Sequence, residues 1–366
     1  MKKIMLIFGT RPEAIKMAPI IIELKKRNVA KCIVCVSGQH KELLYDVLEN
    51  FEIVPDEDFS VMKKNQSLTE LTSRLLVYSK NAITKYDPDI ILVHGDTATA
   101  FSASLAAFYL NKPVAHIEAG LRTGDFKSPF PEEFNRFFID KISSLLFAPT
   151  KKTFDNLIKE GIDEEKVFIT GNTVIDSLFL MIEKINDKKI KNSNIKTILV
   201  TGHRRESFGK KFENICYALK DIANNNSNVQ IIYPVHLNPN VQEPVNRILK
   251  NIKNISLIDP QNYKDFISLM SSSYLILTDS GGIQEEAPSL KIPTLVMRDK
   301  TERQEGVDAN LLKLVGTNKE DIIREVQNLI TNKDAYESMR QNPSPYGDGL
   351  ASVKIVNKVF NYLDIM

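Results

Sequence analysis

The chain has few of the features that mark membrane, secreted or nucleic-acid-binding proteins. No apolar run approaches the ~18–20 residues that cross a bilayer, and Met1-Lys2-Lys3 leads straight into an apolar run, so we expect neither membrane insertion nor a signal peptide. Three cysteines make no disulfide framework. A formal net charge of +2 gives no general electrostatic attraction for nucleic acid. These absences favour a cytoplasmic protein without a nucleic-acid partner.

Motifs for cofactors and metals are also missing. No Gly-x-Gly-x-x-Gly is present, so a nicotinamide cofactor is not indicated. The histidines lie at or near strand ends, but they form no closely spaced His/Cys set, and the signal for zinc is weak. Cys32 and Cys35 are three apart in a strand pattern and face opposite sides, which favours two core residues over a redox pair. We therefore predict no metal and no cofactor.

What the chain does have is a recurring alternation of apolar runs and polar segments with helical spacing. Its 366 residues fit two domains, and 43% hydrophobic with 26% charged residues is ordinary for a soluble globular protein. Near-continuous Val/Ile/Leu strands imply a parallel sheet covered on both faces. The runs of the first half are Ile4–Phe8, Ile33–Val36, Ile90–Val93, Val114–Ile117, Leu145–Phe147 and Val167–Ile169, and the clearest helical segment is Leu68–Tyr86.

The alternation restarts after the Lys/Asn-rich stretch Lys184–Lys196, which is either a linker or a solvated loop. The later runs are Ile198–Val200, Val229–Tyr233, Ile255–Ile258, Leu275–Leu277 and Thr294–Val296. The strand count exceeds eight and the pattern breaks in the middle, so two doubly wound α/β domains are favoured over a (β/α)8 barrel. A final helix, Ser352–Leu363, is expected to pack back onto the first domain.

The segment Asp279–Glu286 directly follows an apolar run and opens a short helix. Small residues at a helix start leave backbone N–H groups aimed at a ligand, and two glycines let a phosphate approach closely. Glu286 lies about one turn further along, where a carboxylate suits the hydroxyls of a ribose. An ordinary capped helix with an exposed acidic first turn is the alternative.

Charged residues gather at the predicted strand ends of the first half. Thr10 and Glu13 are spaced as a capping box, so Arg11 and, one turn on, Lys16 project beside the sheet edge where ligands bind. Asp96 and Glu118 end neighbouring apolar strands, and Glu132 with Glu133 opens a later helix. Carboxylates at adjacent strand ends can converge as a general acid and a general base. Taken singly, each charge is more often a cap or a surface ion pair.

A series of segments, in order over nearly the whole chain, resembles the non-hydrolysing bacterial UDP-N-acetylglucosamine 2-epimerases: Phe8–Lys16, Val93–Thr97, His116–Gly124, Pro131–Glu133, Gly171–Thr173, Gly202–Glu206, Pro234–Pro239 and Thr278–Pro288. The resemblance implies a glycosyltransferase-B-like fold with two Rossmann-like domains facing a central cleft. We expect the first domain to span 1–170 plus the helix 352–366 and to carry the acid/base residues. The second, 171–351, is expected to bind UDP.

The activity implied is the interconversion of UDP-GlcNAc and UDP-ManNAc, which supplies ManNAc-type sugars for bacterial surface polysaccharides, by a cytoplasmic homodimer. The C2 proton of such a sugar has no adjacent carbonyl, so simple deprotonation is prohibitively slow. Elimination is the open route: UDP leaves C1, a carboxylate takes the C2 proton, and 2-acetamidoglucal remains bound. Reprotonation on the opposite face and return of UDP give the epimer. The route needs two acid/base groups and cations for the departing pyrophosphate.

The resemblance also assigns roles by position. The acid/base candidates are Asp96, Glu118 and Glu132, with His203 near the pyrophosphate. The substrate and UDP contacts are Arg11, Lys16, Ser280, Gly281, Gly282, Glu286 and Arg303. A possible second, allosteric sugar-nucleotide site involves Gln39, Glu42, Arg204 and His236, where Glu42 stands at a position that is glutamine in some relatives. Four alternatives stay open: a hydrolysing relative, an epimerase of a di-acetamido or uronic-acid UDP-sugar, a glycosyltransferase of the same fold, and a non-catalytic sensor.

Overall fold

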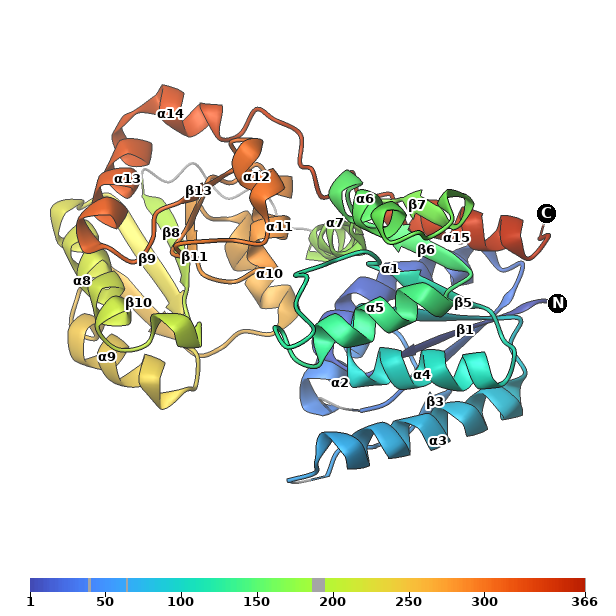
Figure 1. Cartoon of the computed structure of the whole chain (residues 1–366). Coiled ribbons are helices and arrows are strands. Elements are labelled where there is room, and N and C mark those ends of the chain that lie inside the picture. The colour runs from blue at the N-terminus through green and yellow to red at the C-terminus, as the bar shows by residue number, and fades with distance from the viewer. Residues whose placement is uncertain (39–40, 64, 186–194, 366) are drawn as a thin grey trace. The chain divides into compact units, whose positions relative to one another are not determined.

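Two compact α/β units make up the chain, which a computed structural model describes over residues 1–38, 41–63, 65–185 and 195–365 (Figure 1). The first unit comprises Met1–Leu180 and Tyr346–Met366, and the second comprises Met181–Pro345. The first unit thus extends to Leu180 rather than to residue 170, and it takes up the chain again at Tyr346 rather than at 352. Val174, Ile175 and Tyr346 form one buried cluster with the partly buried Ile15 of α1 (Arg11–Arg27), so both segments pack on the first unit.

The sheet of the first unit has, over the described residues, seven parallel strands in the order β3-β2-β1-β4-β5-β6-β7. Such an order, with two halves wound outward from β1, is that of a Rossmann-like fold, and its ligands lie at the carboxyl ends of the strands. The strands are β1 (Lys3–Phe8), β2 (Lys31–Val36), β3 (Glu57–Asp58), β4 (Ile90–His94), β5 (Val114–Ile117), β6 (Leu145–Ala148) and β7 (Val167–Ile169).

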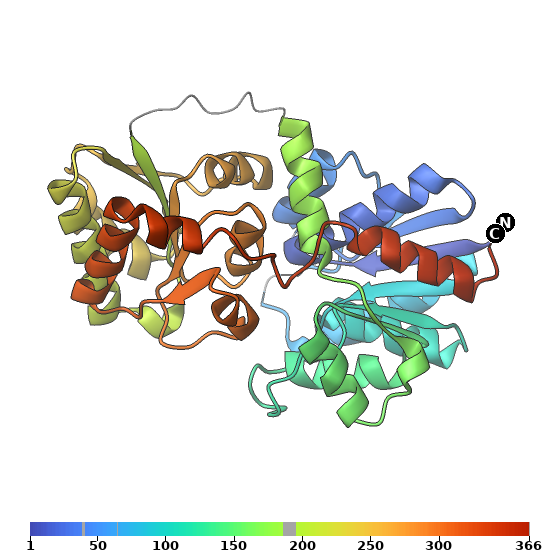
Figure 2. The same ribbon diagram turned by 90° about the horizontal axis from the view of Figure 1, so that it is seen from above.

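Helices cover this sheet, and local sequence signals set their ends. Ser67 and Glu70 form a reciprocal capping box at the start of α3, and Asp87 ends that helix in the left-handed region. The helices are α1 (Arg11–Arg27), α2 (Lys41–Asn50), α3 (Leu68–Tyr86), α4 (Ala98–Tyr109), α5 (Glu132–Ile142), α6 (Lys151–Lys159), α7 (Thr173–Ile185) and α15 (Ala351–Tyr362), with a 3₁₀ turn at Glu164–Lys166. As expected, α15 packs back onto this unit, against α1 (Figure 2).

The second unit repeats the same design. Its described strands form a parallel sheet in the order β10-β9-β8-β11-β12-β13. They are β8 (Lys196–Thr201), β9 (Val229–Pro234), β10 (Ile255–Ile258), β11 (Leu275–Thr278), β12 (Thr294–Val296) and β13 (Leu312–Leu314). The helices are α8 (Lys210–Asn225), α9 (Pro239–Leu249), α10 (Tyr263–Ser271), α11 (Ile283–Ser289), α12 (Gln304–Asp308), α13 (Lys319–Thr331) and α14 (Lys333–Ser338), with a 3₁₀ turn at Arg205–Ser207.

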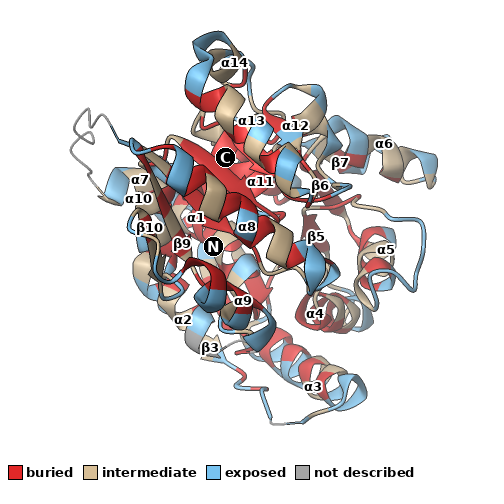
Figure 3. Ribbon diagram, turned by 90° about the vertical axis from the view of Figure 1, so that its left-hand side faces the viewer, coloured by how far each residue is buried: buried red, intermediate tan, exposed pale blue. Residues whose placement is uncertain are grey.

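Each unit buries its own apolar core between sheet and helices. In the second unit the strands are buried beneath helices that are exposed on their outer faces (Figure 3). Cys35 is buried in the first unit, whereas Cys32 is only half-buried because it stands next to the exposed start of β2, so the expectation of two core cysteines is wrong for Cys32. Of the stretch expected as a linker or loop, residues 186–194 lie outside the described part of the chain. None of the described helices is long and apolar enough to cross a bilayer.

Candidate active site

The first helix of the chain begins at the carboxyl end of β1 through the capping box that the sequence predicts. Thr10 accepts a hydrogen bond from the backbone of Glu13, and the Glu13 carboxylate accepts from the backbone N–H groups of Gly9 at 3.0 Å and Thr10 at 2.8 Å. The Thr97 hydroxyl donates to the same carboxylate at 2.7 Å. Burial raises the pKa of Glu13 to about 7, against these hydrogen bonds. This arrangement joins the turns after β1 and β4 and fixes the start of α1.

Glu118, just past β5, lies where charged groups from several elements meet. Its Oε2 accepts hydrogen bonds from Lys16 on α1 and from Asn172 Nδ2 at 3.0 Å, and His94 Nε2 lies 3.8 Å from the same oxygen. The Glu118 backbone has φ 66°, in the left-handed region that a non-glycine residue rarely adopts. Such a conformation costs about 1–3 kcal/mol and clusters at functional sites. The structure therefore brings Lys16 and Glu118 together, as their strand-end positions predict.

Asp96 follows β4 and is held by helix α5. Arg136 Nη2 lies 2.5 Å from Asp96 Oδ2, and Asn135 Nδ2 donates to the Asp96 carbonyl at 2.8 Å. Burial raises the pKa of Asp96, the Arg136 cation opposes that rise, and the charges of Glu118 and Glu132 add to it. Glu118 and Glu132 therefore both lie within electrostatic reach of Asp96. Two of them differ in environment, because Glu118 faces a lysine and an amide whereas Asp96 faces an arginine.

His94, the last residue of β4, is a buried neutral base beside these groups. Burial lowers its pKa to about 3, although the Glu118 carboxylate acts in the opposite direction. Among the described residues its Nε2 has no hydrogen-bond partner. A bound polar ligand can supply the hydrogen bond that such a buried nitrogen lacks. Arg11, the first residue of α1, is half-buried at the same sheet edge.

In the second unit the buried carboxylate of Asp279 organises the ends of β8 and β11. Its Oδ2 accepts hydrogen bonds from the backbone N–H groups of His203 and Arg204, both at 2.8 Å. The ring of His203 stacks on that of His236, with centroids 5.1 Å apart. Burial lowers the pKa of His203; Asp279 opposes this, while His236 and Arg204 add to it. The structure thus brings His203, Arg204 and His236 together.

The segment after β11 has its glycines at the helix start, as expected. Gly282 occupies the cap position of α11 and, having no side chain, leaves the first-turn amides to a ligand. Glu286 is buried and accepts from the Tyr263 hydroxyl at 3.3 Å, so the alternative of an exposed acidic first turn is wrong. Arg303 covers Gly281 so closely that a Cβ there would come within 3.1 Å of its Cζ. Arg303 also donates to Glu285 at 3.0 Å, which fixes the guanidinium over the turn.

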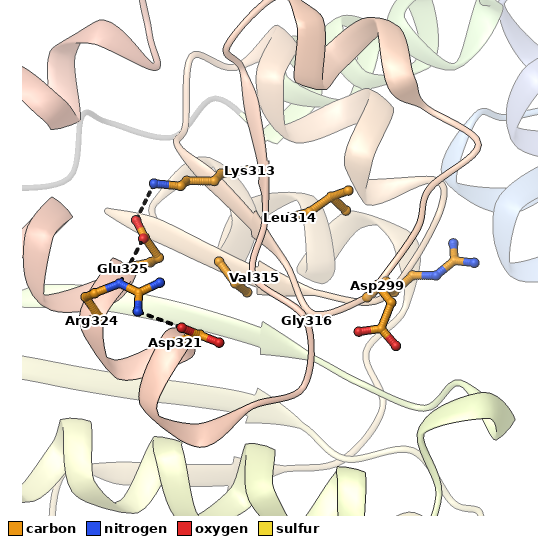
Figure 4. A pocket seen from close by; sticks show the side chains of 9 residues that line it. Asp299, Lys313, Leu314, Val315, Gly316, Asp321, Arg324 and Glu325 are labelled. Carbon is orange, nitrogen blue, oxygen red and sulfur yellow. Dashed lines mark hydrogen bonds and ion pairs between the residues drawn. The ribbon is translucent and has the colours of Figure 1, made fainter.

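A pocket of about 400 Å³ lies elsewhere in the second unit, between the end of β13 and α13 (Figure 4). Its walls carry the ion pairs of Lys313 with Glu325 and of Arg324 with Asp321. Its lining contains none of the residues predicted to bind substrate. Within the described residues no group of three or more His, Cys, Asp or Glu side chains is arranged to hold a metal.

Several residues in these two clusters carried no predicted role. Asn172 and Asp279 stood inside the motifs of the resemblance, while Arg136 is signalled only by its position one turn after Glu132 on a helix. Tyr263 had no signal, because it comes from a different helix, α10. Gln39 and the side chain of Glu42 lie outside the described residues, so their predicted roles stay predictions.

Two Rossmann-like units, one with a carboxylate cluster at its strand ends and one with a glycine-rich turn under an arginine, define a glycosyltransferase-B-like α/β protein. The family model of UDP-N-acetylglucosamine 2-epimerase matches residues 22–359. The chain is 54% identical over 370 residues to a UDP-N-acetylglucosamine 2-epimerase of Campylobacter jejuni, covering 97% of both proteins. The chain belongs to the UDP-N-acetylglucosamine 2-epimerase family, a family of isomerases.

Solved structures agree with this assignment. The UDP-GlcNAc 2-epimerase of Neisseria meningitidis, determined bound to UDP-GlcNAc, has a TM-score of 0.89 and 47% identity, over 98% of this chain and 100% of that one. MurG of Acinetobacter baumannii shares the fold at a TM-score of 0.63 with 13% identity, covering 99% of this chain and 100% of that one.

Proposed function

We propose that the protein catalyses the reversible, non-hydrolysing epimerisation of UDP-GlcNAc to UDP-ManNAc at C2. The observation that carries this proposal is the carboxylate cluster of the first unit, in which Glu118 lies with Lys16, His94 and Asn172 while Asp96 stands within its electrostatic reach. An epimerisation needs one group that takes a proton and another that returns one. A member of this family with such a pair has the required groups.

The elimination follows from the state of these carboxylates. Glu118 accepts from an ammonium and an amide, which favours the ionised form that can take the C2 proton. Burial raises the pKa of Asp96, which favours a form that can return a proton. As the proton leaves C2, the C–H electrons form the C1–C2 double bond, and the C1–O bond breaks with its electron pair staying on UDP. Re-addition reverses these steps with the roles exchanged.

UDP binding belongs, in this proposal, to the second unit. The turn formed by Ser280, Gly281 and Gly282 offers backbone N–H groups to a pyrophosphate, and Arg303 is fixed above this turn. The buried carboxylate of Glu286 suits ribose hydroxyls. His203, kept neutral by burial, offers a ring N–H to the departing UDP. In the first unit, Arg11 and Lys16 complete the set of cations for the sugar and phosphate.

Product analysis tests the reaction class. We expect UDP-GlcNAc incubated with the enzyme to reach an equilibrium with UDP-ManNAc, with no accumulation of free sugar. NMR spectra recorded during the incubation monitor all of these species. Stoichiometric free ManNAc and UDP would instead assign the hydrolysing reaction. A nucleotide-sugar that binds and stays unchanged would assign a sensor. Parallel incubations with di-acetamido and uronic-acid UDP-sugars test the preference for the sugar, and a role in bacterial surface polysaccharide supply follows from UDP-ManNAc formation.

We also propose regulation by a second UDP-GlcNAc through Arg204 and His236, together with Gln39 and Glu42. The support is that Arg204 and His236 both adjoin His203, so a ligand on them reaches a residue of the UDP site. UDP-ManNAc alone should then react poorly until a trace of UDP-GlcNAc is added. Turnover of pure UDP-ManNAc without a lag would show that this chain lacks the allosteric site, and Glu42 would be the first residue to examine.

The homodimer and the cytoplasmic location stay predictions. The neighbouring helices α3 and α4 both carry exposed large apolar side chains, which an interface with a second copy would cover. These side chains are Val77, Tyr78, Phe108 and Tyr109. Light scattering during gel filtration tests the dimer, where the mass of a single chain at micromolar concentration would contradict it, and cell fractionation tests the location.

A further inference from the structure

Helix α5 holds the turns of the first unit through a row of side chains along one face. Glu133 accepts from the backbone N–H groups of Thr123 and Gly124, both at 2.9 Å. One turn on, Asn135 and Arg136 hold Asp96, as described above. A further turn on, Asp140 is completely buried and faces β5. Positions 133, 136 and 140 share a helix face, so one helix contacts the turns after β4 and β5.

The last member of this row, Asp140, meets a completely buried histidine. Asp140 Oδ1 lies 2.6 Å from His116 Nδ1, and the other ring nitrogen, Nε2, lies 2.7 Å from the carbonyl oxygen of Gly95. Gly95 separates His94 from Asp96. Asp140 Oδ2 also accepts from the N–H of Gly120 at 3.2 Å, two residues beyond Glu118. His116 and Asp140 therefore connect the turn that carries Asp96 to the turn that carries Glu118.

The hydrogen-bond partners define the protons on this ring. The Gly95 carbonyl oxygen can only accept, so Nε2 carries a proton. Asp140 Oδ2 accepts from Gly120 and from the Arg122 guanidinium, at 2.7 Å, and these two contacts stabilise an ionised carboxylate, which favours a proton on Nδ1 as well. Arg122 is in turn held by Glu160 at 2.6 Å. Two cations, His116 and Arg122, thus alternate with two carboxylates, Asp140 and Glu160. This network therefore adds no net charge beside Asp96 and Glu118.

We propose that His116, as a doubly protonated imidazolium paired with Asp140, is a positioning residue that sets the distance between the Asp96 and Glu118 turns. Its two N–H groups hold Gly95 on one side and, through Asp140, Gly120 on the other. Both glycines have positive φ, 64° and 84°, a conformation that is strained for a residue with a side chain. A Cβ on Gly120 would come within 2.2 Å of the Thr153 carbonyl oxygen. The proposal rests on the proposed roles of Asp96 and Glu118.

The functional consequence concerns the intermediate. In the elimination, 2-acetamidoglucal stays bound until a proton donor positioned at C2 protonates it and UDP adds back to C1. Displacement of either turn slows re-addition, so more of the glycal and UDP escapes during each turnover. The ratio of released glycal to epimerised product depends only on folded, active molecules. A role confined to stability would lower the amount of active enzyme and leave this ratio unchanged.

Two substitutions separate the two hydrogen bonds of the ring. In His116→Asn the amide nitrogen stands near the position of Nδ1 and keeps the contact with Asp140, whereas in His116→Gln it stands near Nε2 and keeps the contact with Gly95. We expect His116→Asn and Asp140→Asn to raise the glycal-to-product ratio by on the order of tenfold, the effect of one lost hydrogen bond to a charged network. His116→Gln should raise it less than His116→Asn, because its amide still holds the Gly95 carbonyl while Asp140 itself still holds the N–H of Gly120.

Asp176→Asn is the matched control. Asp176 is also buried in the first unit and accepts from the backbone N–H groups of Ala351 at 3.2 Å and Ser352 at 2.7 Å, which belong to the start of α15 and not to the turns that carry Asp96 and Glu118. It should lose stability with an unchanged ratio. A ratio that is unchanged in His116→Asn and Asp140→Asn, or that rises equally in Asp176→Asn, overturns the proposal.

Neutron diffraction from crystals of the wild-type enzyme tests the same claim without a substitution. We expect deuterium on both ring nitrogens of His116, and deuterium on one nitrogen only would overturn the proposal. The wild-type reaction is the control for the proposed function: if it yields no epimer, the roles of Asp96 and Glu118 fail, while the diffraction result still reports on the His116–Asp140 pair.

Discussion

Replacing Glu118 with glutamine removes a proton acceptor while keeping the size of the side chain. Lys16 and Asn172 both donate to the Glu118 carboxylate, and an amide retains an oxygen for one of them but cannot take a proton from carbon. General acid–base catalysis contributes about 10²–10⁴-fold. We therefore expect kcat to fall by at least ~10² in Glu118→Gln, with KM for UDP-GlcNAc largely kept, because most of the proposed nucleotide contacts lie in the second unit.

The same substitution has a separate effect on stability. The Lys16 and Glu118 side chains are each only 14% exposed, and a hydrogen bond to a charged group in such a place contributes about 1.5–3 kcal/mol. At about 2–4 °C per kcal/mol for a unit of this size, Tm should fall by several degrees. Activity should therefore be measured at a temperature at which the thermal unfolding curve of the variant shows that it is fully folded.

Glu23→Gln provides the matched control for this loss. Glu23 pairs with Arg27 at 2.7 Å within α1, and its side chain is 12% exposed. This variant should lose a comparable ion pair and keep the wild-type kcat. A Glu118→Gln enzyme with kcat within about threefold of wild type, a change of less than ~1 kcal/mol in the barrier, would refute the reasoning.

Three further predictions concern the nucleotide site, pH and metals. Glu286→Ala should raise KM by about 10–100-fold with a smaller effect on kcat, whereas Tyr263→Phe, which removes only the 3.3 Å hydrogen bond to Glu286, should change KM far less; equal effects would contradict the ribose role. Because the folded-state pKa of Glu13, about 7, lies above its ordinary value of 4.5, the folded state holds the extra proton between these values. The stability from this group is complete below pH 4.5 and is lost as pH rises towards 7, so urea midpoints should fall less from pH 5 to pH 8 in Glu13→Gln than in wild type. EDTA should leave activity unchanged and added nicotinamide cofactor should not raise it; activity lost in EDTA and restored by a divalent ion would contradict the proposed chemistry.

Much of the fold follows from the sequence because parallel strands are buried on both faces. The predicted runs Ile90–Val93 and Leu275–Leu277 became β4 and β11, and Leu68–Tyr86 became α3 with the predicted bounds. Two edge strands escaped prediction for physical reasons. β3 (Glu57–Asp58) has two residues, both acidic, and β13 (Leu312–Leu314) has an exposed lysine in its middle, so neither strand forms an apolar run.

The candidate site was predictable where a residue ends a strand and unpredictable where it reaches the site from a helix. Glu118 and Asp96 follow strands whose carboxyl ends adjoin, so their proximity is dictated by topology. The pairing of His116 with Asp140 is different. It depends on how α5 is rotated about its axis over the sheet, which is a result of packing and not of sequence spacing.

Incorporation of solvent deuterium at C2 tests the proposed elimination. Epimerisation of UDP-GlcNAc in deuterated water requires the abstracted proton to be replaced from a second group that exchanges with solvent. We expect one deuteron on C2 of the UDP-ManNAc formed, seen by NMR as loss of the C2 proton signal. UDP-ManNAc formed at full rate with the original C2 proton retained would contradict the elimination by two carboxylates.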